Sequence, residues 1–144
     1  MKAQFLLVTV VFFSFSSIGQ ISSNDCRKST PVFELAEKMP EPAGGMDSLK
    51  IFFQKELISW GLDNQTHKLD IDLLIDNAGS ACPYMIYLAP YTLPTDKITN
   101  SINSMSTWKP AMQNGHKVDC YVKLSLQIEA GVLTKLIYKN SKNR

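Results

Sequence analysis

The sequence predicts an α+β domain in which two helices pack on one face of a small antiparallel sheet. Three observations support this prediction. Residues 117–129 alternate apolar and polar side chains along their length, which is typical of a half-buried strand, and residues 67–77 show the same alternation. Two segments with apolar residues at helical spacing, 46–58 and 96–107, precede and separate the predicted strands.

The first helix is expected over residues 46–58, directly after a proline- and glycine-rich loop at 39–45. Asp47 lies in its first turn, where the helix dipole favours an acidic side chain. Gly61 is placed to end the helix, because glycine readily adopts the left-handed backbone of a C-terminal cap. Residues 31–37, which precede the loop, partly alternate and are read as a short edge strand.

The strand at 67–77 and the segment at 82–89 are expected to form a hairpin around a turn at 77–79. Pro83 and Pro90 lie near the ends of the second strand. Proline has no backbone N–H and is found in sheets mainly on edge strands, so this strand is expected at an edge. Its alternate residues are expected to share one face: Cys82, Tyr84, Ile86 and Leu88.

The second helix is expected over residues 96–107, and Pro110 prevents its continuation. Trp108 is the last residue of its apolar stripe and is expected to anchor the core. A helical crossover leaves the second strand and the strand at 117–129 parallel to each other. In an antiparallel sheet the first strand must then lie between them, so the expected strand order is 2-1-3. Residues 117–129 become an edge strand with unpaired backbone groups, unless the tail at 133–138 covers that edge.

The N-terminus is typical of an export signal over residues 1–19. Lys2 is followed by an apolar run at 5–13 and then by small residues up to Gly19. The run is shorter than the roughly 20 apolar residues of a membrane-spanning helix, so cleavage after Gly19 is expected. An uncleaved anchor is the alternative.

Cleavage there divides the remaining chain into a flexible lead-in at 20–30, one domain at 31–129 and a basic tail at 130–144. The formal net charge of the full chain is only +2, and no basic cluster is interleaved with aromatic residues. Nothing in this balance indicates nucleic-acid binding.

The chain contains three cysteines, Cys26, Cys82 and Cys120, and an odd number leaves one thiol over in an exported protein. Their spacing does not match a zinc site. Cys82 and Cys120 lie on strands that are two apart in the expected order, about 9–10 Å from each other. A disulfide bridges Cα atoms within about 7 Å, so these two are not expected to bond, and a bridge from Cys26 to either stays open.

Several segments resemble the C-terminal domain of the TonB family. They are the proline–glycine stretch before the first helix (37–49), the hairpin at 69–79, and the segment 104–118 with its Trp-x-Pro and Asn-Gly motifs. The last of these is the most specific. The resemblance covers about residues 31–129, and the predicted order of elements is also the family's order.

The resemblance implies a non-enzymatic binding domain in the periplasm. In the family, the last strand adds a short extended segment of an outer-membrane receptor to the sheet edge. A protein partner is therefore expected, with no cofactor, no metal and no nucleic acid, and pairing of the edge with a second copy would give a homodimer. The residues implied to bind the partner are Tyr121, Val122, Lys123, Leu124, Ser125, Leu126 and Gln127.

Two other functions are carried as alternatives: a membrane-anchored, short energy transducer of the TonB type, and a small secreted enzyme. Asp70, Asp72 and Asp76 form an acidic stripe, and paired carboxylates can perform acid–base or metal chemistry. The stripe is read as the solvent-facing side of a strand, paired across to a lysine of the third strand, because no recognisable catalytic motif accompanies it. His67 and His116 are read as exposed.

Overall fold

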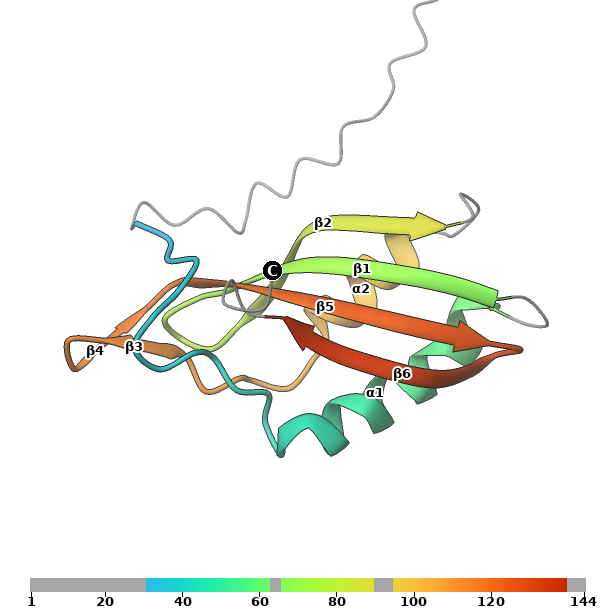
Figure 1. Ribbon diagram of the computed structural model, residues 1–144, viewed down its shortest axis with the longest axis horizontal. Coiled ribbons are helices and arrows are strands. Elements are labelled where there is room, and N and C mark those ends of the chain that lie inside the picture. The colour runs from blue at the N-terminus through green and yellow to red at the C-terminus, as the bar shows by residue number, and fades with distance from the viewer. Residues whose placement is uncertain (1–30, 63–65, 90–94, 140–144) are drawn as a thin grey trace, which may run out of the picture.

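The computed structural model describes residues 31–62, 66–89 and 95–139 (Figure 1). The predicted export signal and lead-in, at 1–19 and 20–30, lie outside the described residues. In chain order the elements are α1 (Gly45–Trp60), β1 (Thr66–Ile75), β2 (Ala81–Ala89), α2 (Thr95–Asn103), β3 (Ala111–Gln113), β4 (His116–Val118), β5 (Cys120–Glu129) and β6 (Val132–Lys139).

Four strands form one antiparallel sheet in the order β2-β1-β5-β6, and β3 and β4 form a separate short hairpin. Both helices lie on the same side of the large sheet (Figure 1). The predicted α+β class, with two helices and a small antiparallel sheet, is confirmed. We call the side away from the helices the open face; it carries the even-numbered residues of β1 and the odd-numbered residues of β5.

The expected edge position of 117–129 is wrong, because β6 pairs with β5 from Lys123 to Glu129. The tail covers this edge, so the sheet extends past the predicted domain boundary at 129. A two-residue turn joins the strands, and both its residues, Ala130 and Gly131, have positive φ, at 48° and 77°. This is the backbone of the tight hairpin turns that match the twist of a sheet.

The side chains of β2 are distributed over the two faces of the sheet differently from the prediction. Met85 pairs with Asp72, but the next residue of β1 pairs with Pro83, so Tyr84 is an extra residue at a bulge. A bulge reverses the alternation of faces along one strand. Ile86 therefore packs against the core, whereas Cys82 lies on the open face, and the predicted common face of Cys82, Tyr84, Ile86 and Leu88 is wrong.

The main core lies between the sheet and the helices. Odd-numbered residues of β1 and even-numbered residues of β5 point into it, as their alternation predicts. Burying one large apolar side chain contributes about 1.5–3 kcal/mol, so this layer supplies most of the stabilisation. Its largest fully buried members are Phe53, Leu57, Leu69, Ile71, Leu73, Ile75, Ile98, Ile102, Val122, Leu124, Leu126 and Ile128.

The structure confirms that Gly61 ends α1, but α2 is shorter than predicted. Gly61 caps α1 with φ 73°, and its N–H donates a hydrogen bond to the carbonyl of Ile58. α2 ends at Asn103, short of the predicted end at 107. The chain continues to Trp108, which is buried in the core as predicted. The backbone N–H of Trp108 donates a hydrogen bond to the Gly79 carbonyl at 2.8 Å.

Residues 31–44, which we call the N-terminal arm, are held to the domain by three isolated bridges. Phe33 exchanges two backbone hydrogen bonds with the start of β5, and Lys38 and Glu41 do the same with Met112 and Lys109. The predicted short strand at 31–37 is therefore reduced to single pairs.

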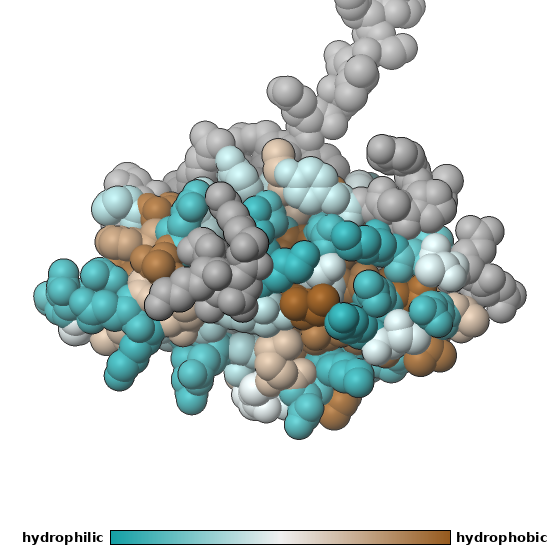
Figure 2. Space-filling view, in the orientation of Figure 1, coloured by the Kyte–Doolittle hydropathy of each residue, from teal (hydrophilic) through white to brown (hydrophobic). Residues whose placement is uncertain are grey.

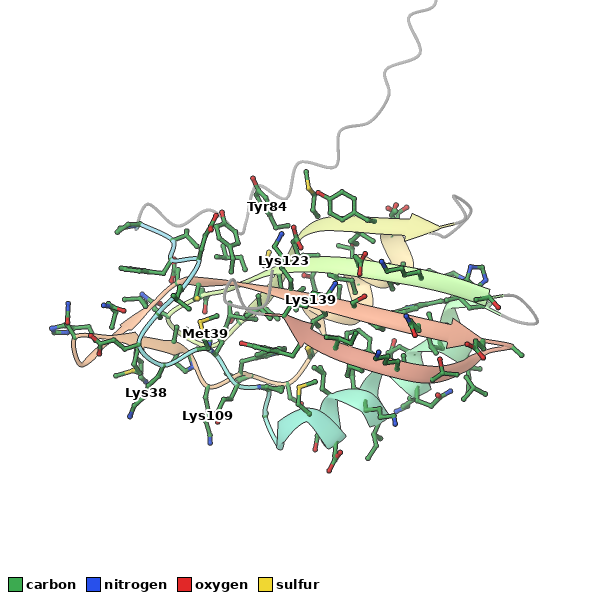
Figure 3. All side chains as sticks on the ribbon, viewed as in Figure 1. Lys38, Met39, Tyr84, Lys109, Lys123 and Lys139 are labelled. Carbon is green, nitrogen blue, oxygen red and sulfur yellow. The ribbon has the colours of Figure 1, made fainter. Side chains whose placement is uncertain are left out.

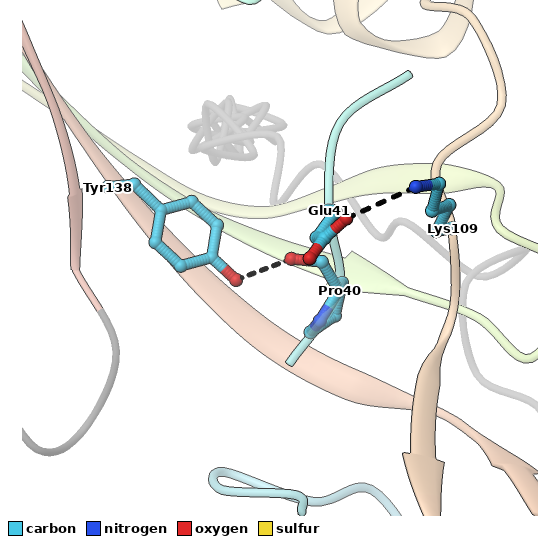
Figure 4. Close-up of polar contacts among 4 residues, drawn as sticks. All are labelled: Pro40, Glu41, Lys109 and Tyr138. Atoms are coloured by element: carbon cyan, nitrogen blue, oxygen red, sulfur yellow. Dashed lines mark hydrogen bonds and ion pairs between the residues drawn. The ribbon is translucent and has the colours of Figure 1, made fainter. Parts of the chain in front are cut away.

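Side chains fasten the arm further (Figure 4). The Tyr138 hydroxyl donates to the Pro40 carbonyl at 2.8 Å, and the Lys109 ammonium lies 3.3 Å from the Glu41 carboxylate. Tyr138 also stacks on Trp108, with ring centroids 6.4 Å apart. The end of β6 is thus tied to both the arm and the core.

Candidate protein-binding edges

The residues implied to bind a partner all lie on β5, which occupies an interior position in the sheet. On one side β5 pairs with β1 along its whole length. On the other side Tyr121 bonds to Phe33, and the stretch from Lys123 onward pairs with β6. The edge on which strand addition at 121–127 depends is therefore occupied by the chain itself.

The two outer strands of the sheet are β2 and β6. The Phe33 N–H donates to the Asp119 carbonyl, and the Tyr121 N–H donates to the Phe33 carbonyl, so odd-numbered residues of β5 direct their backbone groups away from β1. Backbone direction alternates along each strand. Even-numbered residues of β1 therefore direct their backbone groups toward β2. Their partners on β2 bond back to β1, so the N–H and C=O groups of the intervening residues, Ile86 and Leu88, point to the outer side of β2.

On β6 the same reasoning turns Thr134, Leu136 and Tyr138 outward. The Leu133 N–H, at the start of this edge, is taken by the Gln54 side-chain oxygen at 2.7 Å. Lys135 is exposed on β6, and lysine on an edge strand discourages pairing with another chain. β6 is thus a protected edge.

β2 has a different character, because exposed large side chains gather on it. Tyr84, Met85 and Tyr87 are 42%, 46% and 51% exposed. Pro83 and the bulge at Tyr84 interrupt the ladder only at the first part of the strand. The outer side of β2 from Met85 to Ala89, which we call the β2 edge, therefore combines outward backbone groups with exposed apolar side chains.

The open face beside the β2 edge is largely hydrophilic, with scattered hydrophobic residues (Figure 2). A hollow of about 300 Å³ opens on it, and its lining includes Tyr87 and Leu124 together with four charged side chains. Lys123 and Lys139 reach over this face from neighbouring strands (Figure 3). The charged lining residues are Asp70, Asp72, Lys123 and Lys139.

These charges largely neutralise one another. The Lys123 ammonium lies 3.4 Å from the Asp72 carboxylate, which confirms the predicted cross-strand pair. Burial acts to raise the pKa of Asp70, but hydrogen bonds from Ser125 and Lys68 and the charges of Lys68 and Lys139 outweigh it and hold that pKa below its ordinary value. The acidic stripe is thus a paired surface.

The described histidines and acidic residues are the candidates for metal or acid–base chemistry. Within 31–62, 66–89 and 95–139, no group of three His, Cys, Asp or Glu side chains is placed to hold a metal ion. His116 is exposed as expected, but His67 is buried on the helix side of β1, contrary to the prediction. Its neighbour in the register is Ile128, so it lies among apolar side chains.

The cysteines separate into two kinds. Cys120 has a free, buried thiol, and burial raises its pKa to about 11. Cys82 forms a disulfide bond. The prediction that these two are not bonded to each other is confirmed, and Cys26 lies outside the described residues.

No described helix has the length and apolar character needed to cross a membrane. Comparisons with protein-family models, with curated proteins and with solved structures found no match for this chain.

Proposed function

We propose that this chain is a non-enzymatic, periplasmic protein-interaction domain of the TonB C-terminal type, which binds an extended segment of a partner by strand addition. The observation that supports this proposal is the β2 edge, where outward backbone groups lie beside the exposed side chains of Met85 and Tyr87. The partner class, an outer-membrane receptor or another protein with an extended segment, comes from the sequence resemblance.

The strand that receives the partner differs from the one that the resemblance implies. Residues 121–127 are paired on both sides, so a partner strand at β5 would have to displace β6. Displacing β6 would break its ladder and the hydrogen bond from Tyr138 to Pro40. No described strand pairs with the outer side of β2, so a partner strand there would displace none of them, and we therefore propose that the partner binds at the β2 edge.

The affinity expected at this edge is modest. Ile86 and Leu88 offer two donors and two acceptors, and a main-chain hydrogen bond contributes roughly 0.5–1.5 kcal/mol, about 2–6 kcal/mol in total. Ordering the partner segment opposes this gain, so contacts to Met85 and Tyr87 must supply the remainder. Such a complex forms and separates readily, as suits a contact with a transporter.

The test is binding of synthetic peptides that cover the N-terminal segments of outer-membrane receptors from the same organism, measured by fluorescence anisotropy. Ile86→Pro removes an outward N–H from β2 and should weaken binding about tenfold, a change of about 1.4 kcal/mol. The matched control is Leu136→Pro, which removes an outward N–H from β6 and should leave the affinity unchanged. Circular dichroism establishes that both variants are folded.

A second pair of variants keeps the backbone intact. Tyr87→Lys places a charge on the exposed side chain of the β2 edge, and Val132→Lys does so at an equally exposed position of β6. Only Tyr87→Lys should weaken peptide binding. Loss of binding with the β6 variants alone would contradict the β2 edge, and failure of every receptor peptide to bind would contradict the proposed function.

A further inference from the structure

The β2 edge carries no charge. β2 contains no charged residue, whereas β6, the other outer strand, contains Lys135 and Lys139. Charged side chains, lysine above all, are a common means by which an edge strand avoids pairing with another chain. Pro83 and the bulge at Tyr84 serve that purpose only at the first part of β2. Since no described strand pairs with its outer side, the β2 edge is open to pairing.

We propose that a second copy of this chain covers the β2 edge in the free protein, and that this dimer regulates access of the receptor segment to the same edge. The two β2 strands run antiparallel about a two-fold axis at Tyr87, and the two four-stranded sheets become one continuous sheet. Neither helix extends past β2 at this edge (Figure 1). The regulation rests on the proposed function, whereas the dimer itself does not.

The outward backbone groups select the register. Ile86 and Leu88 are both fully used when Ile86 of one copy lies opposite Leu88 of the other, because each such pair exchanges two main-chain hydrogen bonds. A shift by two residues in one direction sets Leu88 opposite the bulged residue Tyr84. A shift in the other direction sets Ile86 opposite Pro90, which has no N–H to donate. The two-fold axis at Tyr87 therefore gives the most complete ladder.

This register sets Tyr87 of one copy directly opposite Tyr87 of the other, in what we call the central row. Tyr87 bonds back to β1 in its own sheet, so the two tyrosines form a non-hydrogen-bonded pair, in which opposite Cα atoms are about 4.5 Å apart. Cross-strand aromatic pairs of this kind stabilise a sheet. Tyr87 is 51% exposed, and its hydroxyl contacts the sulfur of Met85. Two copies of this surface cover each other on the open face.

The charges beside the edge permit this approach. The central row places the two copies of Asp70 three strand spacings apart, about 14 Å. That separation exceeds the Debye length of about 8 Å at physiological salt, and each Asp70 carboxylate lies 3.3 Å from the Lys68 ammonium of its own chain. Met85 lies opposite Ala89 of the other copy, so the next row aligns Asp72 of one chain with Lys68 of the other. No like charges lie directly opposite each other across the contact.

The dimer is expected to be weak and reversible. Only the stretch from Met85 to Ala89 pairs, far less than the roughly 20–30 residues per side of a stable interface. A dissociation constant between about 1 μM and 1 mM is expected for so small a contact. The second copy and the receptor segment need the same N–H and C=O groups of Ile86 and Leu88, so one excludes the other.

Sedimentation equilibrium of the full chain, at concentrations between about 1 μM and 1 mM, tests the dimer. We expect the mean mass to rise with concentration from that of one chain toward twice that value. Tyr87→Lys sets two ammonium groups opposite each other and should raise the dissociation constant about tenfold or more. The control Val132→Lys, at an exposed position of β6, should leave it unchanged. The mass of a single chain at every concentration, or equal dimerisation of Tyr87→Lys, would overturn the dimer.

The register is tested by photo-oxidative crosslinking, which joins tyrosine rings that are in contact. In the wild type we expect a covalent dimer linked between two copies of tryptic peptide 69–97, which contains Tyr87. Tyr87→Phe keeps an aromatic ring, so it should keep the dissociation constant and lose most of the crosslinked dimer. An equal yield of crosslinked dimer from Tyr87→Phe would overturn the register.

The regulation is tested by adding a saturating amount of a synthetic receptor peptide to the dimer in the same sedimentation experiment. We expect the mass to fall to that of one chain with one peptide. A dimer that binds the peptide without separating would overturn the regulation. If the chain dimerises but binds no receptor peptide, the proposed function and the regulation fail and the dimer stands. If peptides bind to a chain that never dimerises, the dimer fails and the proposed function stands.

Discussion

The indole Nε1–H of Trp60 donates a hydrogen bond of 2.9 Å to the hydroxyl of Ser101. The Ser101 hydroxyl in turn donates to the carboxylate of Glu56, so one serine of α2 joins two residues of α1. Both Trp60 and Ser101 are buried. This contact fixes how the two helices lie on the sheet.

Ser101→Ala should lower the free energy of unfolding by about 1–3 kcal/mol, because it leaves the indole N–H of Trp60 buried without an acceptor. Chemical denaturation measures the change. The matched variant Trp60→Phe removes the donor instead, and the double variant should lose less stability than the sum of the two single variants. Strict additivity would show that the hydrogen bond contributes nothing.

Gly79→Ala should be among the most destabilising single changes in the hairpin between β1 and β2. A Cβ at this position would lie 2.0 Å from the Trp108 carbonyl oxygen, and φ is +87°. Gly115→Ala is the control, because φ there is +76° but nothing lies within 4 Å of the added Cβ. We expect a cost of about 1 kcal/mol at Gly115 from the backbone alone and a clearly larger one at Gly79. Thermal melting compares them, and equal costs would contradict the close approach.

Stability should fall in acid partly through Asp70, whose folded-state pKa lies below its ordinary value of 3.8. A group with a lowered folded pKa contributes stability above its unfolded pKa, and that contribution is lost as the pH falls through the folded pKa. Denaturation at a series of pH values between about 6 and 2 should therefore show a shallower loss for Asp70→Asn than for the wild type. Ser125→Ala, which removes a hydrogen bond to this carboxylate, should flatten the profile in the same direction. An unchanged profile in both variants would contradict this assignment.

The exported chain should begin near Gln20, because cleavage is expected after Gly19. Intact-mass analysis of protein recovered from the periplasm gives the N-terminus directly. Retention of Met1 together with recovery in the inner-membrane fraction would favour the anchored transducer instead.

The sequence predicts those parts of the fold that depend on local periodicity. The alternation in β1 and β5 is long enough to define which side chains enter the core, and Gly61 ends α1 by backbone freedom alone. These features need no knowledge of distant contacts. The burial of Trp108 follows from the same helical stripe.

Features that depend on tertiary contacts escape the prediction. The bulge at Tyr84 has no local marker except Pro83, and it exchanges the faces of Cys82 and Ile86. The turn before β6 is weakly marked, because alanine adopts positive φ only uncommonly. β6 forms because its apolar side chains complete the core beside β5, which is a property of the whole sheet.

The candidate site is predicted only in part for the same reason. Pro83 indicates an edge strand at β2, and the structure confirms that position. The resemblance places binding on β5 instead, because it does not account for the strand that follows. Whether a strand can bind a partner depends on both of its neighbours, and one neighbour of β5 lies beyond the matched segment.

The position of β6 as the last described strand has a consequence for synthesis. A growing chain emerges N-terminus first, so β5 is complete before the residues that cover it exist. Until Leu136 and Tyr138 have emerged, the longest apolar strand of the sheet has an open edge on which another chain can aggregate. If synthesis stalled just after Glu129, or the chain were truncated there, the edge of β5 would stay open. The nascent protein would then depend on a chaperone.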